Sequence, residues 1–342
     1  MVNRGSPEPR LIREMLMSSA IARETSRDTA FQTLNPAYNA VFQPGRLSLG
    51  LVVPIENYAL GATPTLERHI ERVQLAEALG LGAVWLRDVP FNVPAFGDAG
   101  QMLDPFVYLG ALSQQTSQIA LGVASLILPL RHPAHVAKAA ASVDLMSGGR
   151  LLLGIASGDR PEEYPALNRP FDERGDHFRE SYDYIRRMAD SSPTFSNAFG
   201  DVAGGMDLLP KPTAGKLPLL VTGSSQQSPQ WIASNADGWM TYPRPALQQA
   251  ALIDQYRQNI EATGGHDKPV MEPLYVDIAE DPDTPPTPIH LGIRTGIEPL
   301  REYLRQREAI GVNHVALNLR FNGANIETTL ELLADRLLPD FS

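Results

Sequence analysis

The 342-residue sequence contains no cysteine, which excludes disulfide frameworks, zinc–thiolate sites, iron–sulfur clusters and thiol nucleophiles. This lack agrees with a reducing cytoplasm, which is the location we expect. Long hydrophobic runs are also missing, since the longest reach about half of the roughly 20 residues that a membrane helix needs. We therefore expect no membrane segment. The N-terminus carries arginines but no apolar core of the kind that a secretory signal has.

Positive charge is scarce, with 29 basic against 39 acidic residues and a formal net charge of -10. Such a chain repels a phosphate backbone overall, so we expect no nucleic-acid partner. A Schiff-base mechanism needs a lysine at the end of a strand. The lysines instead lie in one helical pattern and in loops that precede strands, at Lys138, Lys211, Lys216 and Lys268.

Two further kinds of site are weakly represented. His132 and His135 form an H-x-x-H, but Pro133 lies between them and no carboxylate flanks them, so we interpret them as residues at a helix start. We expect no metal site. Ser157 stands in GIASG, one place away from the serine of a G-x-S-x-G nucleophile elbow. Serine hydrolysis therefore has no support.

What the sequence does contain is a regular alternation of short apolar runs and helical patterns from Arg46 onward. Alternating strands and helices with continuously apolar strands indicate a parallel sheet that is covered on both faces. A doubly wound sheet would normally carry G-x-G-x-x-G after its first strand, and this chain does not. Eight units favour a closed (β/α)8 TIM barrel over residues 46–342. The predicted strands are 47–53, 83–87, 119–126, 151–157, 217–222, 238–241, 274–279 and 314–319.

Two segments fall outside this repeat. Residues 1–45 read as an N-terminal extension, with a helical pattern around 11–20 and a polar link through Asn35-Pro36 and Pro44-Gly45. The extension covers a barrel face or reaches a neighbouring subunit, and composition does not choose between them. Residues 280–288 carry four prolines among acidic residues, which predicts an excursion after the seventh strand rather than a strand or helix.

Loops rich in small residues follow the fourth and fifth strands. Residues 222–229, TGSSQQSP, combine a glycine, hydroxyl groups and the start of a helix, which is typical of a phosphate site. The same residues also fit an ordinary helix cap with Ser228 capping and Pro229 at the first helical position. Residues 156–160, ASGDR, form a second small-residue loop that carries an arginine.

The order of these segments resembles the luciferase-like monooxygenase superfamily, the flavin-dependent barrels related to bacterial luciferase, over nearly all of residues 46–342. Within it the chain is most similar to uncharacterised luciferase-type oxidoreductases thought to use FMN. The similar stretches are ILPLRHPAHVAKAAASVDLMSGGRLLLGIASG (127–158), EALGLGAVWLRD, NRPFDERGDHF, LLVTGSSQQSPQWIASNADGW and FNGANIETTLELLADRLLP.

The resemblance implies FMN-binding positions at three strand ends. In such enzymes a non-prolyl cis peptide often lies beneath the flavin ring at the end of the third strand, and the matching bond is Ala124-Ser125. The end of the fourth strand matches positions near the flavin edge and phosphate, and the loop after the fifth strand matches the main phosphate-binding turn. The cofactor-binding residues thus implied are Ala124, Ser125, Ala156, Ser157, Gly158, Gly223, Ser224, Ser225 and Gln226.

The chain departs from light-emitting luciferases just after the second strand. Those enzymes have histidines there, one of them an active-site base, whereas this chain reads Arg87-Asp88-Val89-Pro90. Arg87 and Asp88 are candidates for a catalytic role or for a structural ion pair with each other. His177 and Arg174 match positions that line the substrate pocket in some relatives, or else they begin a solvated helix.

The function that the resemblance implies is an FMN-dependent oxidoreductase or monooxygenase that acts on a small organic substrate with reduced flavin from a partner reductase. One alternative is a dehydrogenase that uses the deazaflavin F420, whose longer anionic tail would call on Arg160 and Arg244. Another is a non-catalytic flavin-binding protein. Relatives commonly dimerise through the helices predicted here at 104–116 and 133–146, so we expect a homodimer.

Overall fold

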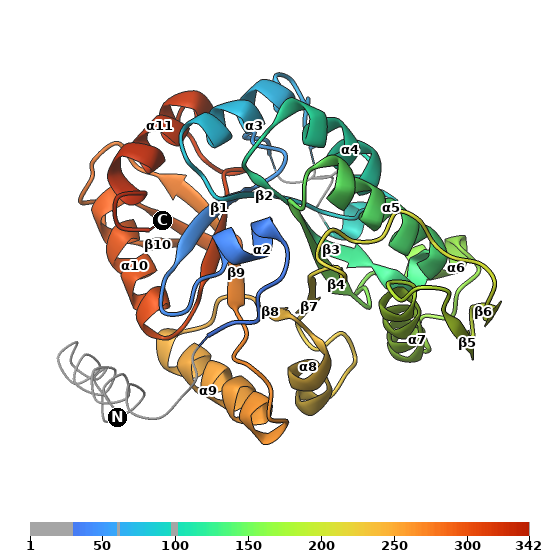
Figure 1. Ribbon diagram of the computed structural model, residues 1–342. Helices are drawn as coiled ribbons and strands as arrows, with labels where there is room; N and C mark the ends of the chain where they lie inside the picture. The colour runs from blue at the N-terminus through green and yellow to red at the C-terminus, as the bar shows by residue number, and fades with distance from the viewer. Residues whose placement is uncertain (1–29, 60–61, 97–101, 342) are drawn as a thin grey trace.

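Eight parallel strands close into a barrel in the computed structural model, which describes residues 30–59, 62–96 and 102–341 (Figure 1). Each strand pairs in parallel with its neighbours, and pairing between the sixth and seventh strands closes the ring. The predicted (β/α)8 barrel is therefore confirmed. In chain order the strands are β1 (Ser48–Val52), β2 (Ala83–Leu86), β3 (Ala120–Ile127), β4 (Leu151–Ala156), β7 (Leu219–Thr222), β8 (Gly238–Met240), β9 (Val270–Ile278) and β12 (His314–Asn318).

Helices cover the outside of the ring, and Figure 1 shows them as an outer layer around the strands. Their apolar sides and the outward faces of the strands form one continuous core. The helices are α3 (His69–Ala78), α4 (Pro105–Gln115), α5 (Pro133–Met146), α7 (Arg174–Arg187), α8 (Pro229–Asn235), α9 (Ala246–Ala262), α10 (Ile297–Ala309) and α11 (Ile326–Leu337). Short helical turns also occur at η1 (Pro94–Phe96), η2 (Leu128–Leu130) and α6 (Glu163–Ala166).

Seven of the eight strands lie within two residues of their predicted bounds, and β9 is the exception. It begins at Val270, four residues before the predicted start. Glu272 and Pro273 interrupt the apolar pattern there, and both residues disfavour a strand in sequence-based reasoning. The structure accommodates Glu272 because its carboxylate lies 3.6 Å from the guanidinium of Arg307, with both side chains buried.

A short helix, α2 (Pro36–Val41), lies across the amino-terminal end of the barrel. Its N-cap, Asn35, donates hydrogen bonds to the Asp144 carboxylate and the Leu151 carbonyl, and the Tyr38 hydroxyl donates to the carbonyl of Asp237 just before β8. The apolar side of α2 packs against the side chains that fill the barrel interior. The polar link expected around Asn35-Pro36 is thus a capped helix that closes this end of the barrel (Figure 1).

Among the residues that the structure describes, two antiparallel hairpins depart from the βα repeat, and neither was predicted. One joins β5 (Thr194–Asn197) and β6 (Gly200–Ala203) after α7. The other joins β10 (Thr287–Ile289) and β11 (Gly292–Thr295), and β11 extends the sheet beside the second half of β9. The predicted excursion after the seventh strand is present, but its last residues form β10 instead of an irregular loop. Pro288 is tolerated because β10 is an edge strand.

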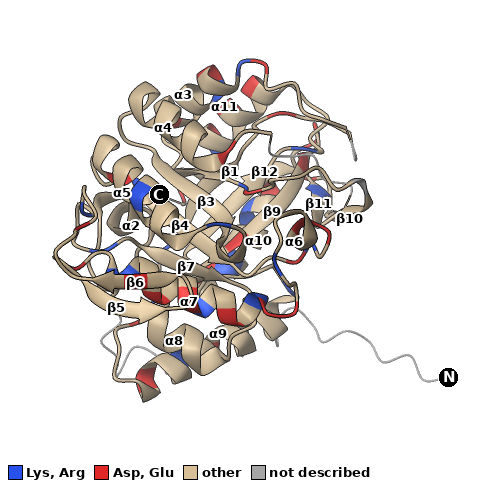
Figure 2. Ribbon diagram, turned by 90° about the vertical axis from the view of Figure 1, so that its right-hand side faces the viewer, with Lys and Arg blue, Asp and Glu red and all other residues tan. Residues whose placement is uncertain are grey.

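The two ends of the barrel carry different elements. Figure 2 shows α2 at one end and α6, β10 and β11 at the other, where both acidic and basic residues gather. The helix expected around residues 11–20 lies outside the described residues. In the ranges that the structure describes, no helix is long and apolar enough to cross a membrane. Within the same ranges, no three His, Asp or Glu side chains are grouped as metal ligands would be.

Candidate functional site

The end of β3 carries the non-prolyl cis peptide Ala124-Ser125, as predicted. The pairing of β3 with β4 shifts register between Val123 and Leu126, so the two intervening residues bulge out of the ladder. The Ser125 hydroxyl forms a hydrogen bond with the Thr222 hydroxyl at the end of β7. Because β4 lies between β3 and β7 in the sheet, this contact brings two strand ends together across the barrel mouth.

The end of β4 lies directly beside the end of β3. Ala156 pairs in register with Ile127. Gly158 has φ of +78°, and a Cβ atom there would lie 2.8 Å from both the Ile127 side chain and the Tyr164 hydroxyl. The Tyr164 hydroxyl in turn donates to the Ser157 carbonyl. Glycine is therefore the residue that this close approach requires, and residues 156–158 present backbone rather than bulky side chains.

The turn after β7 contains three residues with positive φ, namely Gly223 at +56°, Ser225 at +45° and Gln226 at +61°. Turns of this kind can point successive backbone N–H groups to one side, which is the geometry of an anion site. The buried Ser225 hydroxyl donates to the Thr222 carbonyl at 2.8 Å. The exposed Ser224 hydroxyl accepts from the Gln226 amide at 3.4 Å, which leaves its own hydrogen available to a ligand.

The predicted cap of α8 is also present, since the Ser228 hydroxyl accepts from the Trp231 amide at 3.1 Å and Pro229 begins the helix. Likewise, His132 caps α5 through a hydrogen bond from the Ala134 amide, which confirms its interpretation as a residue at a helix start. The cap and an anion site are compatible, because Ser228 lies beyond the residues that form the turn.

The start of α7 packs against this turn. A Cβ atom on Gly175 would lie 2.8 Å from the Cβ of Gln226, and the Gln227 side chain donates to the Gly175 carbonyl at 2.9 Å. His177 lies two residues further on, 3.7 Å from Glu173, with its ring 6.2 Å from that of Phe199. The first turn of α7 thus contacts the 223–226 turn through Gly175, whereas the ring of His177 lies beside Glu173 and Phe199.

Asp88 forms its ion pair with a different arginine from the one predicted. Its buried carboxylate accepts from the Ile127 amide at 3.0 Å and from two nitrogens of Arg131 at 3.1 and 2.7 Å. Burial disfavours the charge on Arg131, but the hydrogen bonds and charges of Asp88 and Asp104 outweigh that effect and raise the pKa of the guanidinium. An ion pair between Arg87 and Asp88 is thus the wrong assignment. Asp88 fixes the chain that follows β3.

Several side chains at the carboxyl ends of the strands were not predicted as site residues. Arg320, two residues after β12, is buried and stacks on the ring of Tyr58 at 4.4 Å. Burial raises the pKa of the Tyr58 hydroxyl, whereas the charges of Arg320 and Arg87 oppose the shift. Arg320 and Tyr58 lie in irregular loops, where no periodicity marks them. Arg160, which was expected to meet an anionic cofactor tail, lies 4.8 Å above the ring of Phe96.

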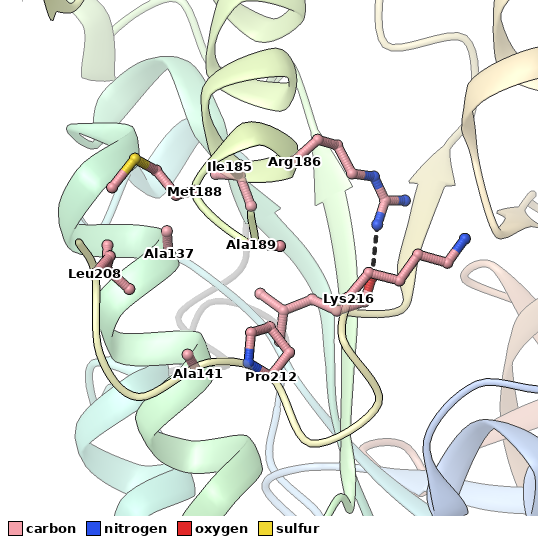
Figure 3. A pocket seen from close by; sticks show the side chains of 10 residues that line it. Ala137, Ala141, Ile185, Arg186, Met188, Ala189, Leu208, Pro212 and Lys216 are labelled. Atoms are coloured by element: carbon pink, nitrogen blue, oxygen red, sulfur yellow. Dashed lines mark hydrogen bonds between the residues drawn. The ribbon is translucent and has the colours of Figure 1, made fainter. Parts of the chain in front are cut away.

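An apolar hollow elsewhere on the molecule lies between α5, α7 and the segment that precedes β7 (Figure 3). Arg186 borders it and donates to the Leu217 carbonyl at 2.7 Å, as the dashed line shows. Arg186 and Lys216 both pair with Asp237, which precedes β8. The hollow is therefore near the amino-terminal ends of the strands, away from the loops where barrel enzymes place their chemistry.

Comparison with known proteins gives a family for this chain. The sequence profile described as luciferase-like monooxygenase matches residues 47–284. An uncharacterised protein of Mycobacterium tuberculosis is 33% identical over 160 residues, 44% of this chain and 56% of its own. An F420-dependent hydroxymycolic acid dehydrogenase of the same organism is 26% identical over 225 residues, 65% of this chain and 60% of its own. The chain thus spans about three-fifths of the length of these curated relatives.

Solved structures share the fold. The monooxygenase RslO1 from Streptomyces bottropensis superposes with a TM-score of 0.72 at 20% identity, covering 85% of this chain and 99% of that one. The oxygenating constituent of 3,6-diketocamphane monooxygenase from Pseudomonas putida, solved in complex with FMN, gives 0.68 at 15% identity, covering 87% and 99%. At these sequence identities, the similarity to the solved structures shows a shared barrel fold alone.

Proposed function

Because the chain belongs to the luciferase-like monooxygenase family, we propose that it is an oxidoreductase that binds FMN at the carboxyl ends of β3, β4 and β7. Bound reduced FMN would supply the electrons for reaction with O2 or another acceptor, on a small organic substrate. We further propose that a separate reductase delivers the reduced flavin, since no G-x-G-x-x-G nicotinamide fingerprint follows the first strand. Both proteins would act in the reducing cytoplasm.

The observation that supports this proposal most is the meeting of three small-residue segments at one end of the barrel. The hydrogen bond between Ser125 and Thr222 joins the end of β3 to the end of β7. The pairing of Ile127 with Ala156 joins the end of β3 to the end of β4. A flat ring needs backbone and small side chains at its face, and an anionic tail needs amide donors. The chain offers both within this group of strand ends, so the residues fit FMN.

The proposed roles follow from the local geometry. The backbone amides of residues 223–226 and the Ser224 hydroxyl would bind the phosphate, while Ser225 would contribute through its amide, since its hydroxyl bonds Thr222. Ala124-Ser125 and residues 156–158 would lie along the ring. The first turn of α7, with Gly175 packed on Gln226, would hold the phosphate turn in place.

Substitution of Ser224 tests the phosphate assignment. Loss of one hydroxyl hydrogen bond to a charged group is worth about 1.5 to 3 kcal/mol, so Ser224→Ala should weaken FMN binding roughly 10- to 150-fold. Fluorescence titration of FMN measures the change. Ser234→Ala is the matched control, because this exposed serine on α8 bonds only the Gln230 carbonyl among its described contacts. Unchanged affinity in Ser224→Ala would remove the assignment.

An F420-dependent dehydrogenase is the second candidate, and the similarity to the hydroxymycolic acid dehydrogenase favours it. Arg160 and Arg244 were the residues expected to meet its longer anionic tail. Arg244 donates to the Thr241 hydroxyl at 2.7 Å and to the Tyr242 carbonyl at 3.0 Å, so it also braces the loop after β8. Titration with F420 and with FMN, followed by O2 uptake in the presence of a flavin reductase, separates the two functions. Flavin binding with no turnover in either assay would indicate a flavin-binding protein.

We also propose a homodimer through α4 and α5, which pack side by side on the barrel (Figure 1). Three alanines of α5, Ala137, Ala140 and Ala141, are buried and so are not part of the surface that a second copy could contact. The surface that supports an interface is made of exposed apolar side chains on and beside the two helices. These are Met102, Leu103, Val107, Leu145 and Met146, with Val107 74% exposed.

A further inference from the structure

The β10–β11 hairpin builds part of the barrel mouth that the βα repeat does not supply. β8 pairs with the first residues of β9, and β11 takes the place of β8 beside the second half of that strand. Gly292, the first residue of β11, pairs with Tyr275, so the hairpin tip at His290 lies level with the middle of β9. The hairpin therefore continues the ring of strands beyond the end of β8, at the end of the barrel opposite α2 (Figure 2).

Tyr275 points into this mouth. Along β9, Val276 belongs to the core between strands and helices, whereas Met271 belongs to the cluster inside the barrel. Because side chains alternate along a strand, Tyr275 shares the inward face with Met271. Asp277 follows on the same face and pairs with Arg294 of β11 at 3.0 Å. This ion pair joins the hairpin to β9 beside the Tyr275 ring.

Other aromatic rings gather around Tyr275. Its ring centroid lies 5.3 Å from that of Phe321, with 33° between the ring planes, and 6.3 Å from that of His290. The rings of His290 and Phe321 are 6.0 Å apart. The Arg320 guanidinium contacts both Phe321, at 5.2 Å, and Tyr58, at 4.4 Å. We call the four rings joined in this way the aromatic wall: Tyr58, Tyr275, His290 and Phe321.

The aromatic wall is accessible and carries hydroxyl groups that the protein does not use. His290 is exposed, and the other three residues are half-buried. Leu291 beside His290 is 54% exposed. Among the residues that the structure describes, none forms a hydrogen bond with the hydroxyl of Tyr58 or of Tyr275. Ring faces with unused hydroxyl donors beside them suit a flat apolar group that bears an acceptor oxygen.

The aromatic wall lies across the mouth from the strand ends where FMN is proposed to bind. Around the closed ring the strands follow the order β1, β2, β3, β4, β7, β8, β9 and β12. The proposed flavin positions follow β3, β4 and β7. The wall is carried by β9, by the hairpin beside it, and by the segments after β12 and β1. A molecule held on the wall would therefore lie between these rings and the proposed flavin site.

We propose that the aromatic wall binds the planar ring of an aromatic substrate that carries a ketone or hydroxyl oxygen. The inference deepens the proposed oxidoreductase function and rests on it for its meaning as a substrate site. Phe321 and His290 would determine specificity, because ring stacking favours a flat ring over a saturated ring of similar size. The Tyr275 hydroxyl would donate to the oxygen of the substrate.

The test compares aromatic ketones with analogues whose rings are saturated. Purified full-length protein, without and with FMN, is titrated with acetophenone, 2-acetonaphthone and their ring-saturated analogues by calorimetry and ligand-observed NMR. We expect each aromatic ketone to bind roughly 3- to 10-fold more tightly than its analogue, even without FMN. Phe321→Leu, Tyr275→Leu and His290→Ala should each remove most of that preference and leave FMN affinity unchanged. Tyr275→Phe should retain the preference, because it keeps the ring.

Phe195→Leu is the matched control, since this ring on β5 packs on Tyr184 at 5.0 Å and should leave the preference unchanged when it is lost. Circular dichroism melts verify that each variant is folded, and His290→Ala, at an exposed position, decides the question if a half-buried variant does not fold.

Equal affinity for aromatic and saturated ketones in the unsubstituted protein would overturn the proposal. A preference that survives all three wall variants would place the ring elsewhere and also overturn it; if that preference requires FMN, the ketone stacks on the flavin itself. A wall-dependent preference in a protein that binds neither FMN nor F420 would uphold the aromatic subsite and refute the proposed function.

Discussion

His314 at the start of β12 gives the chain a predicted loss of stability in mild acid. Its imidazole is fully buried inside the barrel, where the Trp85 indole N–H donates to Nε2 at 2.8 Å. Nδ1 therefore carries the proton of the neutral ring, and it lies 2.7 Å from the Ser48 hydroxyl, which donates to the Val41 carbonyl. Burial lowers the pKa of His314 to about 3.

The sign and size of the effect follow from this shift. In the unfolded chain the imidazole titrates near pH 6.5, so below that pH the unfolded state binds a proton that the folded state excludes. The full stability contribution is present above about pH 6.5 and is lost progressively as the pH falls toward about 3. Linkage gives a loss of about 1.4 kcal/mol at pH 5.5 and about 2.7 kcal/mol at pH 4.5.

Urea unfolding between pH 7.5 and 4.5 measures this loss of stability. Carboxylates also make the free energy of unfolding depend on pH, so their contribution has to be subtracted. His314→Gln keeps an acceptor for Trp85 but cannot titrate, so the difference between the two proteins isolates the histidine. We expect His314→Gln to be less stable at pH 7.5 and the gap to shrink by about 2 to 3 kcal/mol at pH 4.5. His290→Gln, at the exposed tip of the β10–β11 hairpin, is the control and should leave the pH profile unchanged. A gap that is constant with pH would refute the reasoning.

Three other outcomes follow from the described contacts. Asp88→Asn removes the buried one of the two carboxylates that Arg131 pairs with, the other being Asp104, and should lower the free energy of unfolding by about 1.5 to 3 kcal/mol. Asp183→Asn, in an exposed pair, should change it by less than about 0.5 kcal/mol in the same urea titrations. Gly158→Ala places a Cβ 2.8 Å from a buried tyrosine hydroxyl at φ +78°, and should reduce stability and FMN affinity together; a variant with native melting and binding would contradict this. Val107→Glu should convert the proposed dimer to a monomer in light scattering, and a monomeric unsubstituted protein would disprove the interface.

Most of the barrel could be predicted from the sequence because its strands are short apolar runs buried on both faces. β9 was the partial exception, since its first residues include Glu272, which folds into the layer between strands and helices only with Arg307 beside it. The hairpin of β10 and β11 was missed for a related reason. Its edge strand contains Pro288, and an edge position cancels the penalty that proline normally brings.

The site was less predictable because its contacts join residues that are distant in sequence. Small residues at strand ends pointed to the correct end of the barrel, but nothing in the sequence paired Asp88 with Arg131 rather than with Arg87. Tyr58 and Arg320 likewise stand in segments with no motif. Their contact arises from the ring of parallel strands, which brings all carboxyl ends to one face.

Binding of reduced FMN tests the central claim most directly. Under anaerobic conditions, FMN reduced by an added flavin reductase should bind the full-length protein in a saturable manner at one site per chain, and Ser224→Ala should bind it at least roughly tenfold more weakly. Admission of O2 should then reoxidise the bound flavin at a rate that differs from that of free reduced FMN. If neither oxidised FMN, reduced FMN nor F420 binds to a folded preparation, the assignment of this barrel as a flavin-type oxidoreductase is contradicted.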